Sequence, residues 1–236
     1  MALLSRKSKT KPVEAGKLIV IDGIDGSGKS TQFQLLAETL ALAGYKVQRI
    51  KFPRHNQPEA YFVDRYLSGE YGDVEARAAS IFFAVDRFDA SGQIKQWLKE
   101  GYTVLVDRYV TANAGHQGSK IIDRTERLKY FRWLTDLEHN IFNIPKPDLN
   151  IILHMPATIA QKLVDKKQTG RDILENDLQH LKDAAQNFVE IAKLFPNTKL
   201  VECTVGGKLL SPKQIHGKVW ELVRRIALRN VTTQRS

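Results

Sequence analysis

Short apolar runs recur along the chain, separated by longer stretches in which apolar residues keep helical spacing. The runs are four to six residues long and rich in valine, isoleucine and leucine, which is typical of strands buried on both faces. They predict strands at residues 17–22, 103–106, 149–153 and, briefly, 200–203. Residues 47–52, where apolar and polar residues are mixed, are the candidate for a further strand, which makes five.

The stretches between these runs predict helices. Helical patterns cover residues 33–40, 74–99, 123–140, 177–194 and 211–228, and Pro156 is placed to open another helix at its first turn. Gly92 is expected to bend or divide the helix at 74–99, because glycine weakens a helix interior. Residues 53–73 are expected to form a loop with a short helix. Strands that alternate with helices favour an α/β fold, a parallel sheet with helices on both faces.

The loop after the first predicted strand carries the strongest chemical signal. Residues 23–31 fit G-x-x-x-x-G-K-[ST], the phosphate-binding loop of nucleotide enzymes. Glycines let the backbone N–H groups point at a phosphate chain, Lys29 adds a mobile positive charge, and the Ser30 hydroxyl can hold Mg²⁺. A flexible glycine turn is the alternative, but the flanking strand and helix favour an anion site at a helix N-terminus. The expected ATP-binding residues are Gly23, Ile24, Asp25, Gly26, Ser27, Gly28, Lys29, Ser30 and Thr31.

Charged residues gather where the other predicted strands end. In an open parallel sheet the ligand site lies beyond the carboxyl ends of the strands. The second strand leads into Phe52-Pro53-Arg54 and the third into Asp107-Arg108-Tyr109. The fourth is followed by a cationic segment that contains Lys162, Lys166, Lys167 and Arg171. We expect these groups to surround the phosphate loop.

Four motifs in this order resemble the thymidylate kinase family. They are the phosphate loop with Asp25 inside it and Thr31-Gln32 after it, Phe52-Pro53-Arg54, Phe83-Ala84-Val85-Asp86-Arg87, and Asp107-Arg108-Tyr109 followed by Asn113 and His116-Gln117-Gly118. The likeness extends from about Lys17 to about Arg225. It implies the three-layer P-loop NTPase fold, with a five-stranded parallel sheet and a short basic lid at about residues 157–176. It further implies Mg²⁺-assisted, ATP-dependent phosphorylation of dTMP to dTDP by a homodimer, with the apolar helix around residues 81–85 as a contributor to the dimer contact.

The resemblance assigns roles to individual residues. Lys29, Arg108, Arg171 and Asp25 would be catalytic, and Ser30 and Asp107 would hold Mg²⁺. Residues expected at dTMP are Asp25, Phe52, Arg54, Phe83, Arg87, Arg108, Asn113, His116 and Gln117. Arg108 and Arg54 would bind the acceptor phosphate, Phe83 would stack on thymine, and Arg87 would donate to its O4. His116, expected in a loop after Asn113, would lie against the sugar 2′ position.

Arg171 is expected to supply the lid cation. Some family members carry an arginine directly after the aspartate of the loop, but this chain has Gly26 there. The charge that develops between donor and acceptor must then be met from the lid.

Each assignment has a simpler alternative. Phe83 could be ordinary core, Arg87 a surface cation paired with Asp86, and Asp107-Arg108 a buried ion pair at the end of a strand. The lid lysines could form a solvated helix face. Departures from the family pattern occur at Asp22, Ala112 and His154, and Ala112 leaves the details of sugar and base recognition open. Kinases of another nucleoside monophosphate or of a deoxynucleoside, and a non-catalytic regulatory nucleotide-binding protein, remain rival functions.

Composition fits one globular enzyme domain. The chain has 236 residues, 42% of them hydrophobic and 26% charged, as in ordinary soluble proteins. Residues 17–228 are expected to form a single kinase domain between a basic extension at 1–16 and a basic tail at 229–236. Residues 1–16 and 218–236 together hold most of the net charge of +10, so solvated termini are favoured over nucleic-acid binding. A single cysteine, no apolar secretory core and no membrane-spanning run favour a cytoplasmic location.

Overall fold

A single parallel sheet organises the molecule. The computed structural model describes residues 15–165 and 178–228. The sheet contains β1 (Lys17–Asp22), β2 (Val47–Lys51), β3 (Thr103–Asp107), β4 (Leu149–His154) and β5 (Thr198–Glu202) in the order β2-β3-β1-β4-β5. The central strands β1, β3 and β4 are buried almost throughout, as their continuous apolar runs predict. The predicted five-stranded α/β fold is therefore confirmed.

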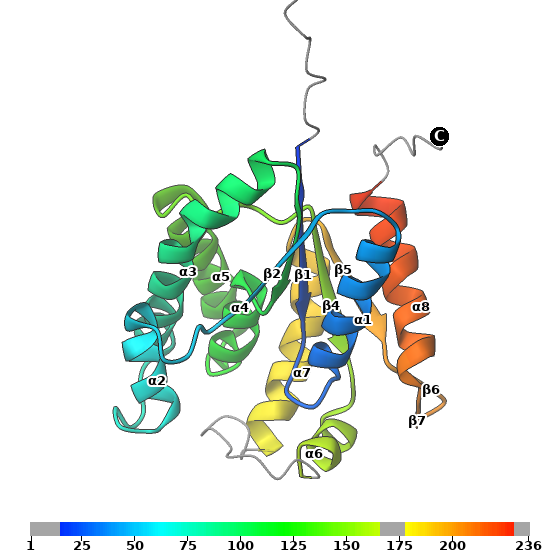
Figure 1. The fold of residues 1–236 in the computed structure, drawn as a ribbon. Coiled ribbons are helices and arrows are strands. Elements are labelled where there is room, and N and C mark those ends of the chain that lie inside the picture. The colour runs from blue at the N-terminus through cyan, green and yellow to red at the C-terminus, as the bar shows by residue number, and fades with distance from the viewer. Residues whose placement is uncertain (1–14, 166–177, 229–236) are drawn as a thin grey trace, which may run out of the picture.

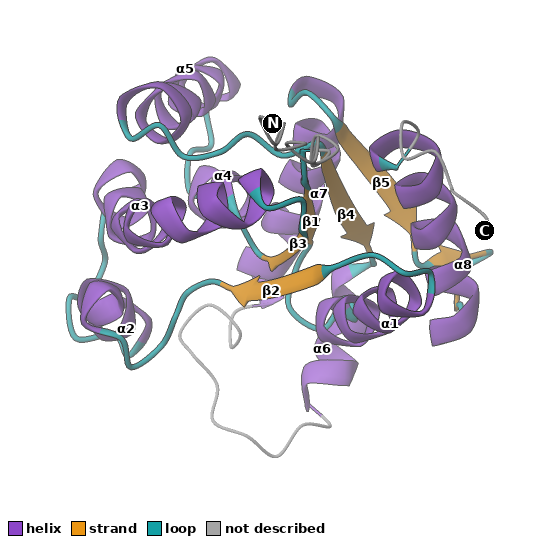
Figure 2. Cartoon of the chain, turned by 45° about the horizontal axis from the view of Figure 1, so that its top comes forward, coloured by secondary structure: helices purple, strands orange, loops and turns teal. Residues whose placement is uncertain are grey.

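Helices cover both faces of this sheet (Figures 1 and 2). α1 (Lys29–Leu42) and α8 (Pro212–Leu222) pack together on one face. α4 (Val110–Gly118) and α7 (Leu178–Leu194) pack together on the other, with α3 (Ala76–Lys99) and α5 (Arg124–Asp136) beside α4. The shorter elements are α2 (Tyr61–Leu67), α6 (Ala157–Asp165), a 3-10 turn at Pro58–Ala60, π-helical turns at Leu137–Ile141 and Val223–Ala227, and a hairpin of β6 (Thr204–Val205) and β7 (Lys208–Leu209).

Side-chain caps fix where several helices begin. The Glu75 side chain accepts hydrogen bonds from the first turn of α3, and Asp123 does the same for α5. Ser211 and Gln214 form a capping box at the start of α8. Such caps satisfy backbone N–H groups that have no partner inside the helix.

Three local predictions were wrong. Gly92 does not divide α3, which is continuous because the burial of Ala90 and Ile94 on either side outweighs a glycine cost of about 1 kcal/mol. His116 lies in helix α4, not in a loop. The fifth strand begins at Thr198 and ends at Glu202, so Cys203 lies beyond it.

The carboxyl ends of all five strands point to the same edge of the sheet, where the phosphate loop and α6 lie (Figure 1). β1 has β3 on one side and β4 on the other, so the chain changes direction across the sheet at β1. A crevice at such a point is the usual ligand site of an open α/β sheet. Within the described residues, no helix is both long and apolar enough to cross a membrane.

Candidate active site

The phosphate loop connects β1 to α1 and depends on its glycines. Gly23, Gly26 and Gly28 have φ angles of 135°, 78° and 89°, in the region that side chains rarely adopt. A Cβ atom on Gly26 would lie 2.2 Å from the backbone oxygen of Ala160 in α6. The loop therefore packs directly on neighbouring backbone, and its shape requires glycine at these positions.

Lys29 is held across the loop in advance of any ligand. Its Nζ donates to the backbone oxygens of Gly23 at 2.9 Å and Ile24 at 2.8 Å, and lies 3.4 Å from Asp25 Oδ1. Burial, followed by repulsion from Arg108, lowers the pKa of Lys29. Anionic phosphates at this position would oppose both effects and stabilise its charged form.

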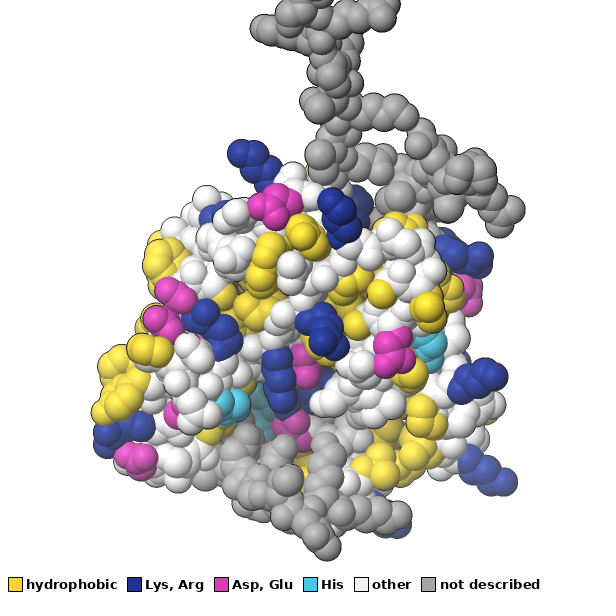
Figure 3. Space-filling model, viewed as in Figure 1, with side chains coloured by type: hydrophobic (Ala, Val, Ile, Leu, Met, Phe, Trp, Pro, Cys, Tyr) yellow, Lys and Arg dark blue, Asp and Glu magenta, His cyan; other side chains and the backbone are white. Residues whose placement is uncertain are grey.

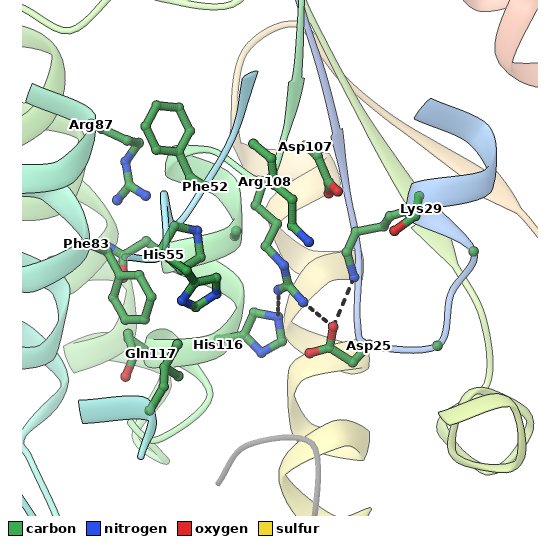
Figure 4. Close-up of a pocket in the computed structure, with 18 of the residues that line it drawn as sticks. Asp25, Lys29, Phe52, His55, Phe83, Arg87, Asp107, Arg108, His116 and Gln117 are labelled. Carbon is green, nitrogen blue, oxygen red and sulfur yellow. Dashed lines mark hydrogen bonds and ion pairs between the residues drawn. The ribbon is translucent and has the colours of Figure 1, made fainter. Parts of the chain in front are cut away.

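Asp25, Arg108 and His116 form a connected set in the centre of the site (Figure 4). Arg108 Nη2 donates to Asp25 Oδ1, and Arg108 Nη1 donates to His116 Nε2 at 3.1 Å. Burial alone would raise the pKa of Asp25, but attraction from Arg108 and Lys29 outweighs it and holds that pKa well below its ordinary value. Burial and the nearby Arg108 lower the pKa of His116 well below 6.5, so its ring stays neutral and accepts from Arg108.

A cavity of about 410 Å³ extends from the phosphate loop past Arg108 to α3 and α4. In the space-filling view, basic, acidic and histidine side chains gather in a hollow of this face (Figure 3). Predicted residues that line the cavity are Asp25, Gly26, Gly28, Lys29, Ser30, Thr31, Phe52, Phe83, Arg87, Asp107, Arg108, Asn113, His116 and Gln117. Motifs that lie up to about 90 residues apart in sequence are thus brought to one cavity.

The end of the cavity away from the phosphate loop is partly aromatic, and hydrogen bonds and an ion pair hold several of its side chains in place. Phe83 meets the Tyr66 ring edge-on at 6.0 Å between centroids, and the Tyr66 hydroxyl donates to Gln117 Oε1 at 3.2 Å. Arg87 forms a buried pair with Glu138, not with Asp86. This end could hold a flat, polar ring.

Arg54 is turned away from the cavity. Its Nε donates to Asp86 Oδ1 at 2.6 Å and its Nη2 to Asp89 Oδ2 at 2.8 Å, which ties the loop after β2 to α3. Lys51, the last residue of β2, and His55 in this loop line the cavity instead. Both escaped the sequence analysis, although each flanks the Phe-Pro-Arg motif. The role of Arg54 at the acceptor phosphate stays a prediction.

Asp107 and Ser30 could hold a metal ion. Both line the cavity near Lys29, and Asp107 Oδ1 is buried with no hydrogen-bond partner within the described residues. No cluster of three or more His, Cys, Asp or Glu side chains that could hold a metal occurs in that part of the chain. The chemistry fits Mg²⁺, which takes a few protein oxygens and completes its shell with water and phosphate oxygens.

The basic lid is described only in part. Lys162 lies in α6, exposed, and Leu163 of the same helix lines the cavity. Lys166, Lys167 and Arg171 lie outside the described residues, and their roles stay predictions.

Several known proteins similar to this chain are described in the same way. A family model described as thymidylate kinase matches residues 21–206. A probable thymidylate kinase of Thermococcus onnurineus is 30% identical over 218 residues, which cover 89% of this chain and 98% of that protein. The human thymidylate kinase is 31% identical over 147 residues, 62% of this chain and 65% of the human protein. A solved structure of thymidylate kinase from Candida albicans superimposes with a TM-score of 0.71 at 28% identity, covering 89% of this chain and 92% of that one.

Proposed function

Because this chain belongs to the thymidylate kinase family, we propose that it transfers the γ-phosphoryl group of ATP to the phosphate of dTMP, releasing ADP and dTDP. The observation that carries the proposal is the single cavity that joins the phosphate loop to the aromatic pocket at Phe83, with Arg108 between them. A donor phosphate chain and an acceptor nucleotide would meet at Arg108.

The chain's cations would do most of the catalytic work. The acceptor is a phosphate monoester and already anionic, so a general base is hardly needed, whereas repulsion between two polyanions must be overcome. Lys29 would hold the donor phosphates and Arg108 the acceptor phosphate, where its planar guanidinium can bind two oxygens. Ser30 and Asp107 would hold Mg²⁺, which when bound neutralises part of the phosphate charge.

Side chains of α3 and α4 would recognise the nucleoside. Phe83 would stack on the base, and Arg87, Asn113 and Gln117 would reach its polar edge. Asp25 would accept a hydrogen bond from the sugar 3′-hydroxyl, and its lowered pKa keeps it an acceptor at every practical pH. The neutral His116 ring would crowd a ribose 2′-hydroxyl.

We further propose that the chain forms a cytoplasmic homodimer through α3. Ile81, Val85 and Phe88 are 42%, 37% and 52% exposed, and their spacing places them on one helix face. Burial of this face against a second copy would remove apolar surface from water. Val85→Glu should convert a dimer into a monomer in sedimentation velocity, and a parent that sediments as a monomer would contradict the dimer. A fluorescent fusion imaged in cells tests the location.

The acceptor preference tests the proposed activity. ADP release should be followed with dTMP, dUMP, UMP, CMP and thymidine as acceptors, because the Candida albicans protein is described as having broad substrate specificity. We expect kcat/KM to be highest with dTMP. Highest turnover with another acceptor would assign the chain to a different nucleotide, and ATP binding without turnover of any acceptor would favour a regulatory protein.

A further inference from the structure

A fully buried carboxylate lies directly behind the base end of the cavity. Glu138 belongs to the π-helical turn Leu137–Ile141 and is 0% exposed. Arg87 Nε donates to its Oε2 at 2.6 Å, and Arg87 Nη2 donates to its Oε1 at 2.7 Å. Two parallel bonds fix the plane of the guanidinium. Within the described residues no hydrogen bond involves Arg87 Nη1, and Arg87 lines the cavity, so this N–H group is left for a ligand.

The same carboxylate also orients Asn113. The Asn113 Nδ2 group donates to the Ser80 backbone oxygen at 3.0 Å and to Glu138 Oε1 at 3.4 Å. A backbone carbonyl and the carboxylate that receives Arg87 can only accept, so the amide must present its NH₂ group to them. Its oxygen then faces the other way.

Like the Nη1 group of Arg87, the amide oxygen of Asn113 points to a ligand. Asn113 is 4% exposed and lines the cavity. Its Oδ1 is buried and has no hydrogen-bond partner within the described residues. A buried acceptor without a partner is costly, and a ligand N–H group would satisfy it.

Glu138 therefore gives the base pocket a fixed polarity, with a donor from Arg87 and an acceptor from Asn113. Thymine and uracil offer the matching edge, an oxygen at C4 and a hydrogen on N3. Cytosine offers the reverse, an amino group at C4 and a bare N3. We propose that Glu138 is a positioning residue that sets the base specificity of the acceptor site through Arg87 and Asn113. The identity of the acceptor rests on the proposed function.

A purely structural role for the Arg87–Glu138 pair makes a different prediction. If the pair only fastens the π-helical turn to α3, its loss should weaken all nucleotides alike. If Glu138 sets the polarity, its loss should change the ratio between bases that differ only in that polarity. The ratio of dTMP to dCMP, in dissociation constant and in kcat/KM, separates the two roles.

The test compares the parent with Glu138→Gln. Glutamine keeps the size but adds an NH₂ group that competes for Asn113 Oδ1 and lets the amide turn over. We expect the preference for dTMP over dCMP to fall at least about tenfold, with KM changing more than kcat. Glu190→Gln is the matched control, because Glu190 is paired with Arg124 and Arg127 away from the cavity and should leave the ratio unchanged.

A ratio within about threefold of the parent, in a variant that melts cooperatively and binds ATP normally, would overturn the proposal. If Glu138→Gln does not fold, Glu138→Asp keeps the charge opposite Arg87 but is too short to reach both partners. Its ratio should fall as well, and an unchanged ratio would again overturn the proposal. If the parent turns over no monophosphate, the proposed function fails, while the two dissociation constants still decide the role of Glu138.

Discussion

Replacement of Arg108 by lysine should weaken the binding of dTMP much more than the binding of thymidine. The guanidinium contacts Asp25 and His116 at once and lies between Lys29 and the base end of the cavity (Figure 4). The guanidinium carries several N–H groups, so it can keep its contact with Asp25 or with His116 and still bind a phosphate. Lysine preserves the charge, but its single nitrogen cannot bind these side chains and the phosphate at the same time.

The size of the loss follows from the number of charged hydrogen bonds. A hydrogen bond to a charged group contributes about 1.5–3 kcal/mol, and lysine would lose at least one such bond to the acceptor phosphate. The dissociation constant of dTMP should therefore rise about 10- to 150-fold. Thymidine has no phosphate, so its dissociation constant should change less than about threefold if Arg108 acts on the phosphate alone.

Calorimetric titration of both ligands into both proteins measures this difference. Arg132→Lys is the matched control, because Arg132 is an exposed arginine of α5 and should leave both affinities unchanged. An equal loss for dTMP and thymidine would refute the reasoning, since it would show that Arg108 supports the pocket and does not bind the phosphate.

Three further substitutions test other parts of the site. Lys29→Ala should lower kcat about 10²- to 10³-fold without loss of cooperative melting, and activity within about tenfold of the parent, only ~1.4 kcal/mol in the barrier, would rule out its assignment. Burial raises the pKa of Asp22 from 3.8 to about 6. The free energy of unfolding therefore falls as the pH rises from about 4 to about 6, and the full loss is present above pH 6. Asp22→Asn should accordingly raise the free energy of unfolding in urea by about 1–3 kcal/mol at pH 7.5 and by nearly nothing at pH 4, whereas a gain that does not depend on pH would contradict this. Arg171→Ala should lower kcat at least about 100-fold with little change in dTMP affinity, and a near-parental kcat would move the role to Lys162, Lys166 or Lys167.

The central strands β1, β3 and β4 were predictable because they are buried on both faces and read as continuous apolar runs. Helix α4 was not, although it lies in the middle of the site. Residues 110–118 are all buried, and their polar side chains Asn113, His116 and Gln117 line the cavity, so this helix lacks the solvent-exposed polar face by which a sequence pattern marks a surface helix. The motif residues in this segment could be recognised, but the helix that carries them could not. His116 was therefore expected in a loop.

Parts of the site that are contiguous in sequence were predictable, and pairings across the fold were not. The phosphate loop needs glycines at fixed spacing, and Asp25 and Arg108 lie within short motifs. Asp86 and Arg87 are neighbours in sequence, but neighbouring residues on a helix point in different directions. Asp86 therefore pairs with Arg54, and Arg87 pairs with Glu138, 51 residues away. Which acid meets which arginine is decided by packing.

Transfer of a labelled phosphoryl group tests the central claim most directly. The parent should be mixed with ATP labelled at the γ-phosphate, dTMP and Mg²⁺, and the products separated after a single turnover. The account predicts that the label appears in the β-phosphate of dTDP, with one ADP formed for each dTDP. Label released as inorganic phosphate, or left in ATP while both nucleotides are bound, would contradict it.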